Sequence, residues 1–245
     1  MAELEVAKHG KNVVHLMTKK EHGLAHRVRE IAVEIAIIVF AVSMSIWLHG
    51  LSEHHHKQEE VKTFLLGLKT DLLADIRQLT ETIEEYRGFD ANYAYLAGLD
   101  PDKKPDWEKF KTAYAKSDAN WYFIPARSRY DGFSMSGRLT NIENEKLLTA
   151  ILYLYQSQLP QVQTSEGGWA NRQRRLREYR EDALEGDDDA SLFRVATTPK
   201  GKRLLRQMIA SPQVYQRYQG YIDQSRQIIK MIDEAYPDQA MVKAH

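Results

Sequence analysis

The sequence contains no cysteine. Disulfide bonds, thiolate zinc sites and cysteine nucleophiles are therefore excluded. Histidine is almost as restricted, because eight of the nine histidines lie at or before His56 and the ninth is the last residue, His245. Residues 57–244 thus lack the commonest general base and the commonest transition-metal ligands of proteins. We therefore expect no enzymatic activity, no metal site and no cofactor.

An excess of charge of either sign is also missing. The chain has 34 Lys and Arg residues and 34 Asp and Glu residues, so its formal net charge is zero. Without a net positive field, we do not expect nucleic acid as a partner. The mean hydropathy is −0.54 although one segment is strongly apolar. The remainder is therefore polar and faces water, which excludes a transporter with many membrane spans.

One long apolar run is present, at residues 31–51, with the sequence IAVEIAIIVFAVSMSIWLHGL. A helix needs about 20 such residues to cross the hydrocarbon core of a bilayer. The run follows residues 1–30 and precedes no small-x-small cleavage site, so a cleaved signal peptide is not expected. Trp47 lies near one end, where aromatic residues gather at membrane surfaces. The sequence predicts a single transmembrane helix.

The flanking charges predict how this helix is oriented. The tail before the span carries six basic residues, namely Lys8, Lys11, Lys19, Lys20, Arg27 and Arg29. Three glutamates (Glu53, Glu59 and Glu60) accompany the two lysines just after the span, Lys57 and Lys62. Basic residues favour the cytoplasmic side. In a Gram-negative bacterium this predicts an inner-membrane protein with a cytoplasmic basic tail (1–30), a transmembrane helix (31–51) and a periplasmic, extracytoplasmic domain (52–245).

The predicted span carries polar and small residues on one face. Glu34, Ala41, Ser45 and His49 lie within a narrow sector of a helix that turns by about 100° per residue. Such a stripe is typical of packing against another transmembrane helix, and an ionisable group in a span indicates function. Alternatively, Glu34 and His49 reach the lipid headgroups from the two helix ends. The predicted partners are other membrane protein subunits or a second copy of this chain, besides the lipid bilayer.

Beyond the span, apolar residues three or four positions apart predict that the helix continues. They are Val61, Leu65, Leu68, Leu72, Ile76, Leu79, Ile83 and Tyr86. Gly88 is the expected C-terminal cap, which would end this helix near Arg87.

Further helices are predicted along the rest of the chain. Their ranges are 89–99, 105–116, 141–159, 161–185, 190–197, 200–210 and 212–236. Thr198-Pro199 and Ser211-Pro212 are the expected starts of the last two, each a cap residue followed by proline. Asn141 is the expected N-cap of the 141–159 helix, Pro160 the expected break after it, and Gly167-Gly168 an interruption of the next. No strand pattern occurs. The predicted fold is all-α, with the transmembrane helix continuing into an elongated extracytoplasmic helical bundle.

Aromatic residues concentrate in the middle of the chain. The candidate ligand pocket consists of Trp107, Tyr114, Trp121, Tyr122 and Phe123, with Tyr130 and Phe133 nearby. Aromatic side chains at helical spacing are more often part of a core than of a pocket. Both interpretations stay open at this point.

Four polar groups are candidate binding sites. His54-His55-His56 suggests a metal or pH-sensing site, but consecutive helical residues point about 100° apart and cannot converge on one ion within a chain. His22 and His26 have a chelating spacing without a third ligand nearby. Asp187–Asp189 lacks the alternation of a calcium loop and is interpreted as the start of a helix.

The fourth group is a run of arginines. Its members are Arg172, Arg174, Arg175, Arg177 and Arg180. They suggest binding of phosphate, lipid headgroups or nucleic acid, but Glu178, Glu181 and Asp182 are interspersed with them. Pairing within the helix, with solvent exposure, is the favoured interpretation.

Two stretches resemble a family of small single-pass bacterial membrane proteins that is catalogued only as a domain of unknown function. In the first, an R-E-I segment enters the span, a Trp lies near its far end and an L-x-x-L-x-x-D-L pattern follows. The matching residues are Arg29-Glu30-Ile31, Trp47, Leu65, Leu68 and Asp71-Leu72.

The second stretch is similar to the segment S-G-x-L-x-x-I-x-N-x-x-L of that family. Here it reads Ser136-Gly137-Arg138-Leu139, Ile142, Asn144 and Leu147. The two stretches together cover about 80 of the 245 residues. The histidines at 54–56 and the longer N-terminal tail depart from the family pattern. The resemblance implies a membrane anchor and a helical fold, and no catalytic or binding residues.

These patterns predict a non-catalytic, membrane-anchored structural or interaction subunit of a membrane protein assembly. The alternative is an extracytoplasmic sensor or small-ligand-binding helical module. A sensor would have to signal through a partner, because residues 1–30 are too few for an output domain. A membrane-bound hydrolase is disfavoured by the lack of histidine and cysteine in residues 57–244.

Overall fold

The computed structural model of the chain describes residues 3–119, 121–186 and 188–237, with side-chain surroundings for Arg29 and from Ile31 onward. Every regular element within these ranges is a helix, and none is a strand. The all-α prediction is therefore confirmed for the described residues.

The first helix, α1 (Glu3–Gly98), contains the apolar run. Its most apolar 18-residue window has a mean hydropathy of 2.4 and no buried residue, so it is long and apolar enough to cross a membrane. All residues from Ile31 to Lys57 are exposed. The chain divides into two compact units, residues 1–59 and residues 60–245.

The predicted end of this helix at Gly88 is wrong, because α1 continues to Gly98. Glycine within a helix costs only about 1 kcal/mol relative to alanine. Just beyond it, Phe89, Tyr93 and Leu96 are buried, and each apolar side chain contributes about 1.5–3 kcal/mol. Burial of this extra segment therefore outweighs the glycine. The predicted apolar stripe before it is buried except for Ile76, which is partly buried.

The remaining elements follow in order. They are α2 (Trp107–Lys116), α3 (Ser128–Met135), the 3₁₀ turn η1 (Arg138–Asn141), α4 (Glu145–Tyr153), the π turn η2 (Leu154–Gln158), α5 (Leu159–Ala183), α6 (Asp189–Thr197), α7 (Pro199–Met208) and α8 (Pro212–Ala235). The proline starts of α7 and α8 agree with the predictions, and α3 was not predicted.

Pro160 does not break the chain's helical path, contrary to the prediction. Helix α4, the π turn and α5 follow one another without a gap, and Pro160 lies in the first turn of α5. Proline lacks an N–H group and its ring crowds the carbonyl four residues earlier. A π turn widens the helix locally. The backbone hydrogen-bond pattern of the helix is therefore already widened in the turn that precedes Pro160. Gly167 and Gly168 do not interrupt α5 either.

The start of α4 also differs from the prediction. Asn144, not Asn141, is the N-cap, and its side chain accepts a hydrogen bond from the Leu147 N–H at 3.1 Å. Asn141 instead ends the turn η1, which follows Gly137 with φ of 72°. Only glycine adopts this left-handed backbone at little cost, which explains the glycine of the Ser136-Gly137 pair.

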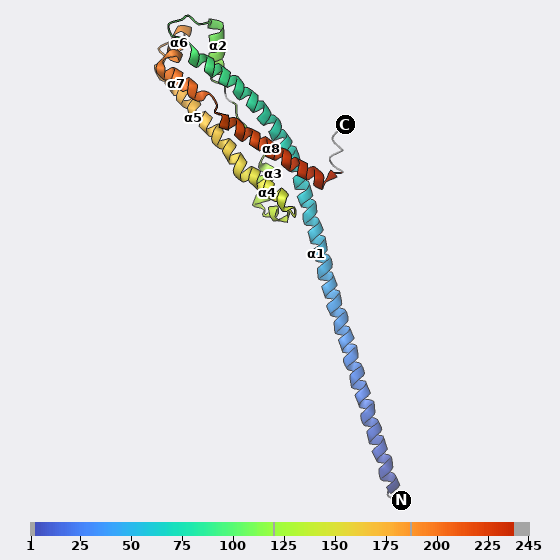
Figure 1. Cartoon of the computed structure of the whole chain (residues 1–245). Coiled ribbons are helices and arrows are strands. Elements are labelled where there is room, and N and C mark those ends of the chain that lie inside the picture. Colours follow the sequence, from blue (N-terminus) through green and yellow to red (C-terminus); the bar gives the residue numbers. More distant parts are fainter. Residues whose placement is uncertain (1–2, 120, 187, 238–245) are drawn as a thin grey trace. The chain divides into compact units, whose positions relative to one another are not determined.

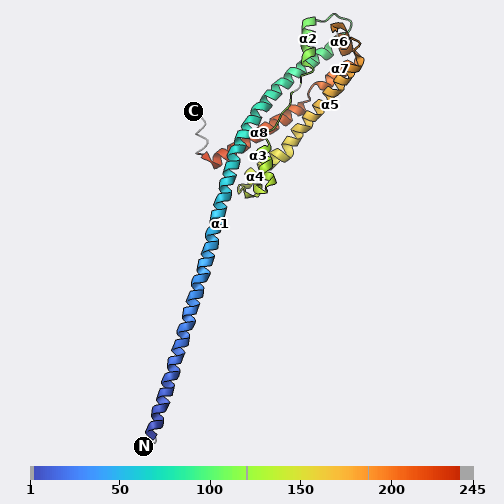
Figure 2. The same cartoon turned by 180° about the vertical axis from the view of Figure 1, so that it is seen from behind.

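Within residues 60–245, both views of the chain show α5 and α8 side by side with the second half of α1 (Figures 1 and 2). Residues along α1 pair with residues in descending order along α8, so these helices are antiparallel. The pairs are Lys69 with Asp233, Asp75 with Tyr221, and Asp90 with Tyr215.

The centre of this unit is aromatic. Tyr86 of α1 lies 5.4 Å from the Trp169 ring of α5 and 5.9 Å from the Tyr218 ring of α8, measured between ring centroids. Tilted and edge-on ring pairs contribute about 0.5–1.5 kcal/mol beyond their buried area. The three long helices are therefore joined at one point by contacts between large, fully buried side chains.

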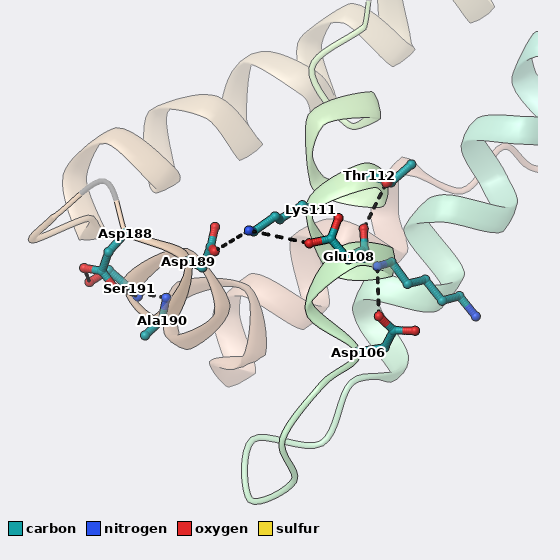
Figure 3. Close-up of polar contacts among 9 residues, drawn as sticks. Asp106, Glu108, Lys111, Thr112, Asp188, Asp189, Ala190 and Ser191 are labelled. Atoms are coloured by element: carbon teal, nitrogen blue, oxygen red, sulfur yellow. Dashed lines mark hydrogen bonds and ion pairs between the residues drawn. The ribbon is translucent and has the colours of Figure 1, made fainter.

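Two short helices, α2 and α6, are joined by the polar contacts that Figure 3 shows. Asp106 caps α2 by accepting from the Lys109 N–H, and Asp188 caps α6 by accepting from the Ala190 and Ser191 N–H groups. Lys111 of α2 and Asp189 of α6 form an ion pair at 3.0 Å between the two helices. The acidic turn was predicted as a helix start, which Asp188 and Asp189 confirm; Asp187 lies outside the described residues.

Candidate functional site

The candidate membrane-packing face lies on α1. Glu34, Ala41, Ser45 and His49 belong to one uninterrupted α-helix, so their predicted spacing on one side applies. All four residues are exposed, and nothing in the described part of the chain covers them. The large apolar residues between them are exposed as well, including Phe40 and Ile46. This face is therefore available to lipid or to another protein.

The five aromatic residues of the candidate pocket divide into two groups. Trp107 and Tyr114 of α2 both contact the Phe110 ring, at centroid distances of 6.0 and 5.6 Å. Trp107 also lies 5.8 Å from Phe193 of α6. This group packs α2 onto α6.

The second group follows α2 in the chain. Phe123 is buried, with its ring 5.5 Å from that of Tyr221. Trp121 packs against the core and donates its Nε1–H to Thr82 Oγ1 at 3.0 Å. Tyr122 is 46% exposed. Four of the five residues thus contribute to packing, and the second group ties the α2–α3 connection to α1 and α8.

A row of tyrosines on α8 was not singled out from the sequence. Tyr215, Tyr218 and Tyr221 each donate a hydrogen bond to a carboxylate of another helix. Their acceptors are Asp90 of α1 at 2.6 Å, Glu166 of α5, and Asp75 of α1 at 2.7 Å. The signal was the repeat Y-x-x-Y-x-x-Y, which aligns its members along one side of a helix. These three pairs set the register of α8 against its two neighbours.

Asp75 is the most buried of these carboxylates, with 1% of its surface exposed. Its Oδ1 accepts from the Ala126 N–H at 2.9 Å and its Oδ2 from Tyr221. Burial raises the pKa of Asp75, and the two hydrogen bonds offset this only in part. The sequence signal was a carboxylate three residues after Leu72 and four before Leu79, within the apolar stripe.

Glu166 and Asp90 have the same character. Burial raises the pKa of both carboxyls, and the tyrosine hydrogen bond opposes it in each case. Around Glu166, three buried polar atoms have no hydrogen-bond partner among the described residues, namely its own Oε2, the Tyr86 hydroxyl and Trp169 Nε1. Ordered water ordinarily fills such positions in protein interiors.

The arginine run is not uniformly exposed, which corrects the favoured interpretation in part. Arg174 pairs with Glu178 at 3.9 Å as expected for residues four apart. Arg180 is instead buried and bonds Asp118 at 2.7 Å and Ser117 Oγ at 2.6 Å, both in the α2–α3 connection. Its guanidinium also lies 4.4 Å from the centre of the Tyr114 ring, a cation–π contact. Arg172 is half-buried.

The histidine candidates give no converging ligand set. His54, His55 and His56 are exposed on α1, and the side chains of His22 and His26 lie outside the described ones. Among the described His, Asp and Glu residues, no group of three or more is placed to hold a metal ion.

Comparison of the chain with protein-family models, with curated proteins and with solved structures found no match. The resemblance to the family of small bacterial membrane proteins therefore stays a prediction.

Proposed function

We propose that this chain is a non-catalytic, single-pass membrane subunit that holds a membrane protein assembly together, with further copies of itself or with other subunits. One observation carries the proposal. The apolar segment of α1 is exposed along its whole length, and one of its faces presents Glu34, Ala41, Ser45 and His49.

Lipid chains can cover the apolar part of this surface, but they cannot pair with the polar residues of the stripe. Ionisable side chains within a span are costly in hydrocarbon, and they are usually paired or face a helix interface. Small residues such as Ala41 and Ser45 let a second helix approach closely. A partner helix on this face would therefore stabilise both the polar and the small residues.

The proposed topology follows the basic residues before the span. Residues 1–30 lie in the cytoplasm, and residues 52–245 form a helical bundle in the periplasm of a bacterial cell. The bundle supplies a second surface for the assembly, because α1, α5 and α8 expose their outer faces to water while their inner faces form the core.

Extraction of the native protein in a mild, uncharged detergent tests this function. Size-exclusion chromatography and mass spectrometry of the co-purifying material would follow. We expect a stable complex larger than the monomer, containing either several copies of this chain or named partner subunits. A protein that elutes as a monomer at every detergent concentration would contradict the assembly role.

Matched substitutions test whether the polar stripe is the contact. Ala41→Ile and Ser45→Ile place bulk on the proposed face, whereas Ala36→Ile and Ser43→Ile place the same bulk about 160–180° away. We expect the first pair to dissociate the complex and the second pair to leave it intact. Equal behaviour of the two pairs would place the contact elsewhere.

A further inference from the structure

A polar cavity of about 300 Å³ lies between α5, α7 and the start of α8. Arg172 enters it from α5 and Arg217 from α8, and the hydroxyls of Thr164, Ser165 and Ser211 also line it. None of the described lining residues is acidic. Two guanidinium groups thus share one cavity without a carboxylate in its wall.

The hydrogen-bonding capacity of Arg172 is unused. No described atom accepts a hydrogen bond from its guanidinium, and its Nε is buried without a partner. Burial lowers the pKa of this arginine, with a further contribution from Arg175, while Tyr86 and Asp90 act in the opposite direction. The Asp90 carboxylate does not compensate Arg172 directly, because its two oxygens already accept from the Ala210 N–H and the Tyr215 hydroxyl.

Arg217 is held in place by a hydrogen bond that uses only part of its donors. One of its terminal nitrogens donates to Ser165 Oγ at 2.9 Å and lies 3.5 Å from the Gln161 carbonyl. A guanidinium has five N–H donors, so most of them stay available. The bond to Ser165 joins Arg217 to α5, the helix that also carries Arg172.

The start of α8 adds positive potential to the same cavity. Ser211 is the N-cap of this 24-residue helix, but its side chain makes no capping hydrogen bond. The positive end of the helix dipole therefore has no side-chain oxygen acceptor from its own N-cap. Helix α7, which faces the cavity through Gln207, carries four basic residues and no acidic one, namely Lys200, Lys202, Arg203 and Arg206.

We propose that this cavity is a binding site for a phosphate group, held by Arg172 and Arg217 with the help of the Ser211 hydroxyl. Guanidinium groups bind phosphate oxygens through paired, charge-assisted hydrogen bonds. The oxygens of a bound phosphate would accept hydrogen bonds both from the Arg172 guanidinium and at the start of α8. The site is independent of the assembly role, because it uses residues 164–217 and no residue of the transmembrane face.

The phosphate has two chemical sources, a free anion and a lipid headgroup. The test uses the full chain in dodecyl maltoside micelles, titrated with sodium phosphate against sodium chloride of equal ionic strength. A parallel titration uses dihexanoyl phosphatidic acid below its critical micelle concentration. A ligand that binds only the folded protein raises its thermal midpoint in proportion to its affinity.

We expect stabilisation by at least one probe, and a loss of affinity of about tenfold or more in Arg172→Gln and in Arg217→Gln. Arg174→Gln is the matched control, because Arg174 stands on the same helix with an exposed side chain. If only inorganic phosphate raises the thermal midpoint, the ligand is a free anion. If only the lipid raises it, the ligand is a lipid headgroup. Either result supports the site if Arg172→Gln removes it and Arg174→Gln keeps it.

Two outcomes would overturn the proposal. One is the absence of stabilisation by both probes beyond the chloride control. The other is equal stabilisation of the wild type and Arg172→Gln. Circular dichroism of each variant establishes that it is folded, and Arg172→Lys provides a second variant that keeps the charge but loses the paired donors. We expect this lysine variant to bind more weakly than the wild type and more tightly than Arg172→Gln.

Discussion

At the scale of single residues, three carboxyl groups accept hydrogen bonds from tyrosine hydroxyls of α8; Asp75 is buried, and Asp90 and Glu166 are partly buried. A tyrosine donates one hydrogen bond and leaves the carboxylate charge uncompensated. Burial therefore raises the pKa of Asp75, Asp90 and Glu166. Each pair favours this one register of α8, because any other register would leave the buried carboxylate without its hydrogen-bond donor, at a cost in free energy.

This arrangement predicts a pH dependence of stability. The pKa of Asp75 is raised from its ordinary value of 3.8, so its contribution is fully present below that pH and is lost as the pH rises through the folded-state pKa. Asp75→Asn does not titrate. We expect the thermal midpoint of the wild type to fall relative to that of Asp75→Asn between pH 4 and pH 8, measured by circular dichroism on the full chain in detergent.

A second variant sharpens the same test. The Tyr221 hydroxyl bond lowers the pKa of Asp75, so Tyr221→Phe should raise that pKa further and make the stability loss with pH larger than in the wild type. Parallel curves for the wild type and Asp75→Asn would show that the Asp75 carboxyl does not titrate differently in the folded and unfolded states.

At the scale of elements, the junction between α6 and α7 depends on a close backbone approach. A Cβ atom at Gly201 would lie 2.3 Å from the Val195 carbonyl oxygen and 2.9 Å from that of Ala196. Thr198 stands between the two helices and caps α7 by accepting from the Gly201 N–H at 2.9 Å. The short connection therefore requires a residue without a side chain at position 201.

Two glycine-to-alanine variants test this requirement. Gly201→Ala should lower the free energy of unfolding by about 1–3 kcal/mol, because backbone atoms must shift to admit the methyl group. Gly88→Ala meets no atom within 4 Å inside α1 and should raise the free energy of unfolding by about 0.5–1 kcal/mol. Denaturant unfolding followed by tryptophan fluorescence measures both, and effects of the same sign would contradict the argument.

At the scale of the whole molecule, the two units differ in whether their apolar residues are buried or exposed. Residues 60–245 contain the buried core, which begins at Val61, whereas every residue from Ile31 to Lys57 is exposed. The stability of the second unit should therefore not depend on the apolar segment at residues 31–51, although the second half of α1 is indispensable to it.

Truncation separates these two roles of α1. A chain that begins at Gln58 should be soluble without detergent and unfold cooperatively on heating. A chain that begins at Phe89 loses Leu65, Leu68, Leu72 and Tyr86 from the core and should not fold. Circular dichroism and thermal unfolding decide between these outcomes. Aggregation of the longer fragment would show that the apolar segment at residues 31–51 is needed for folding.

The sequence by itself determined the apolar span, the all-helical class, the stripe from Val61 to Tyr86 and the starts of α7 and α8. These features depend on local information, namely the length of an apolar run, a spacing of three or four residues, and a cap followed by proline. Each can be recognised within a few turns of helix, so distant parts of the chain are not needed.

Only the tertiary structure decided the rest. In the folded chain α1 extends beyond Gly88, because Phe89 and Tyr93 pack against residues far along the sequence. The helical path also continues through Pro160, by way of a π turn. It also separated the arginines into the exposed Arg174, the buried Arg180 and the cavity-lining Arg172. The physical reason is the same for Gly88 and for the arginines: burial and hydrogen bonding with residues distant in sequence outweigh local preferences of about 1 kcal/mol or less. At Pro160 the π turn admits the proline ring, a rare local geometry that the spacing of apolar residues does not reveal.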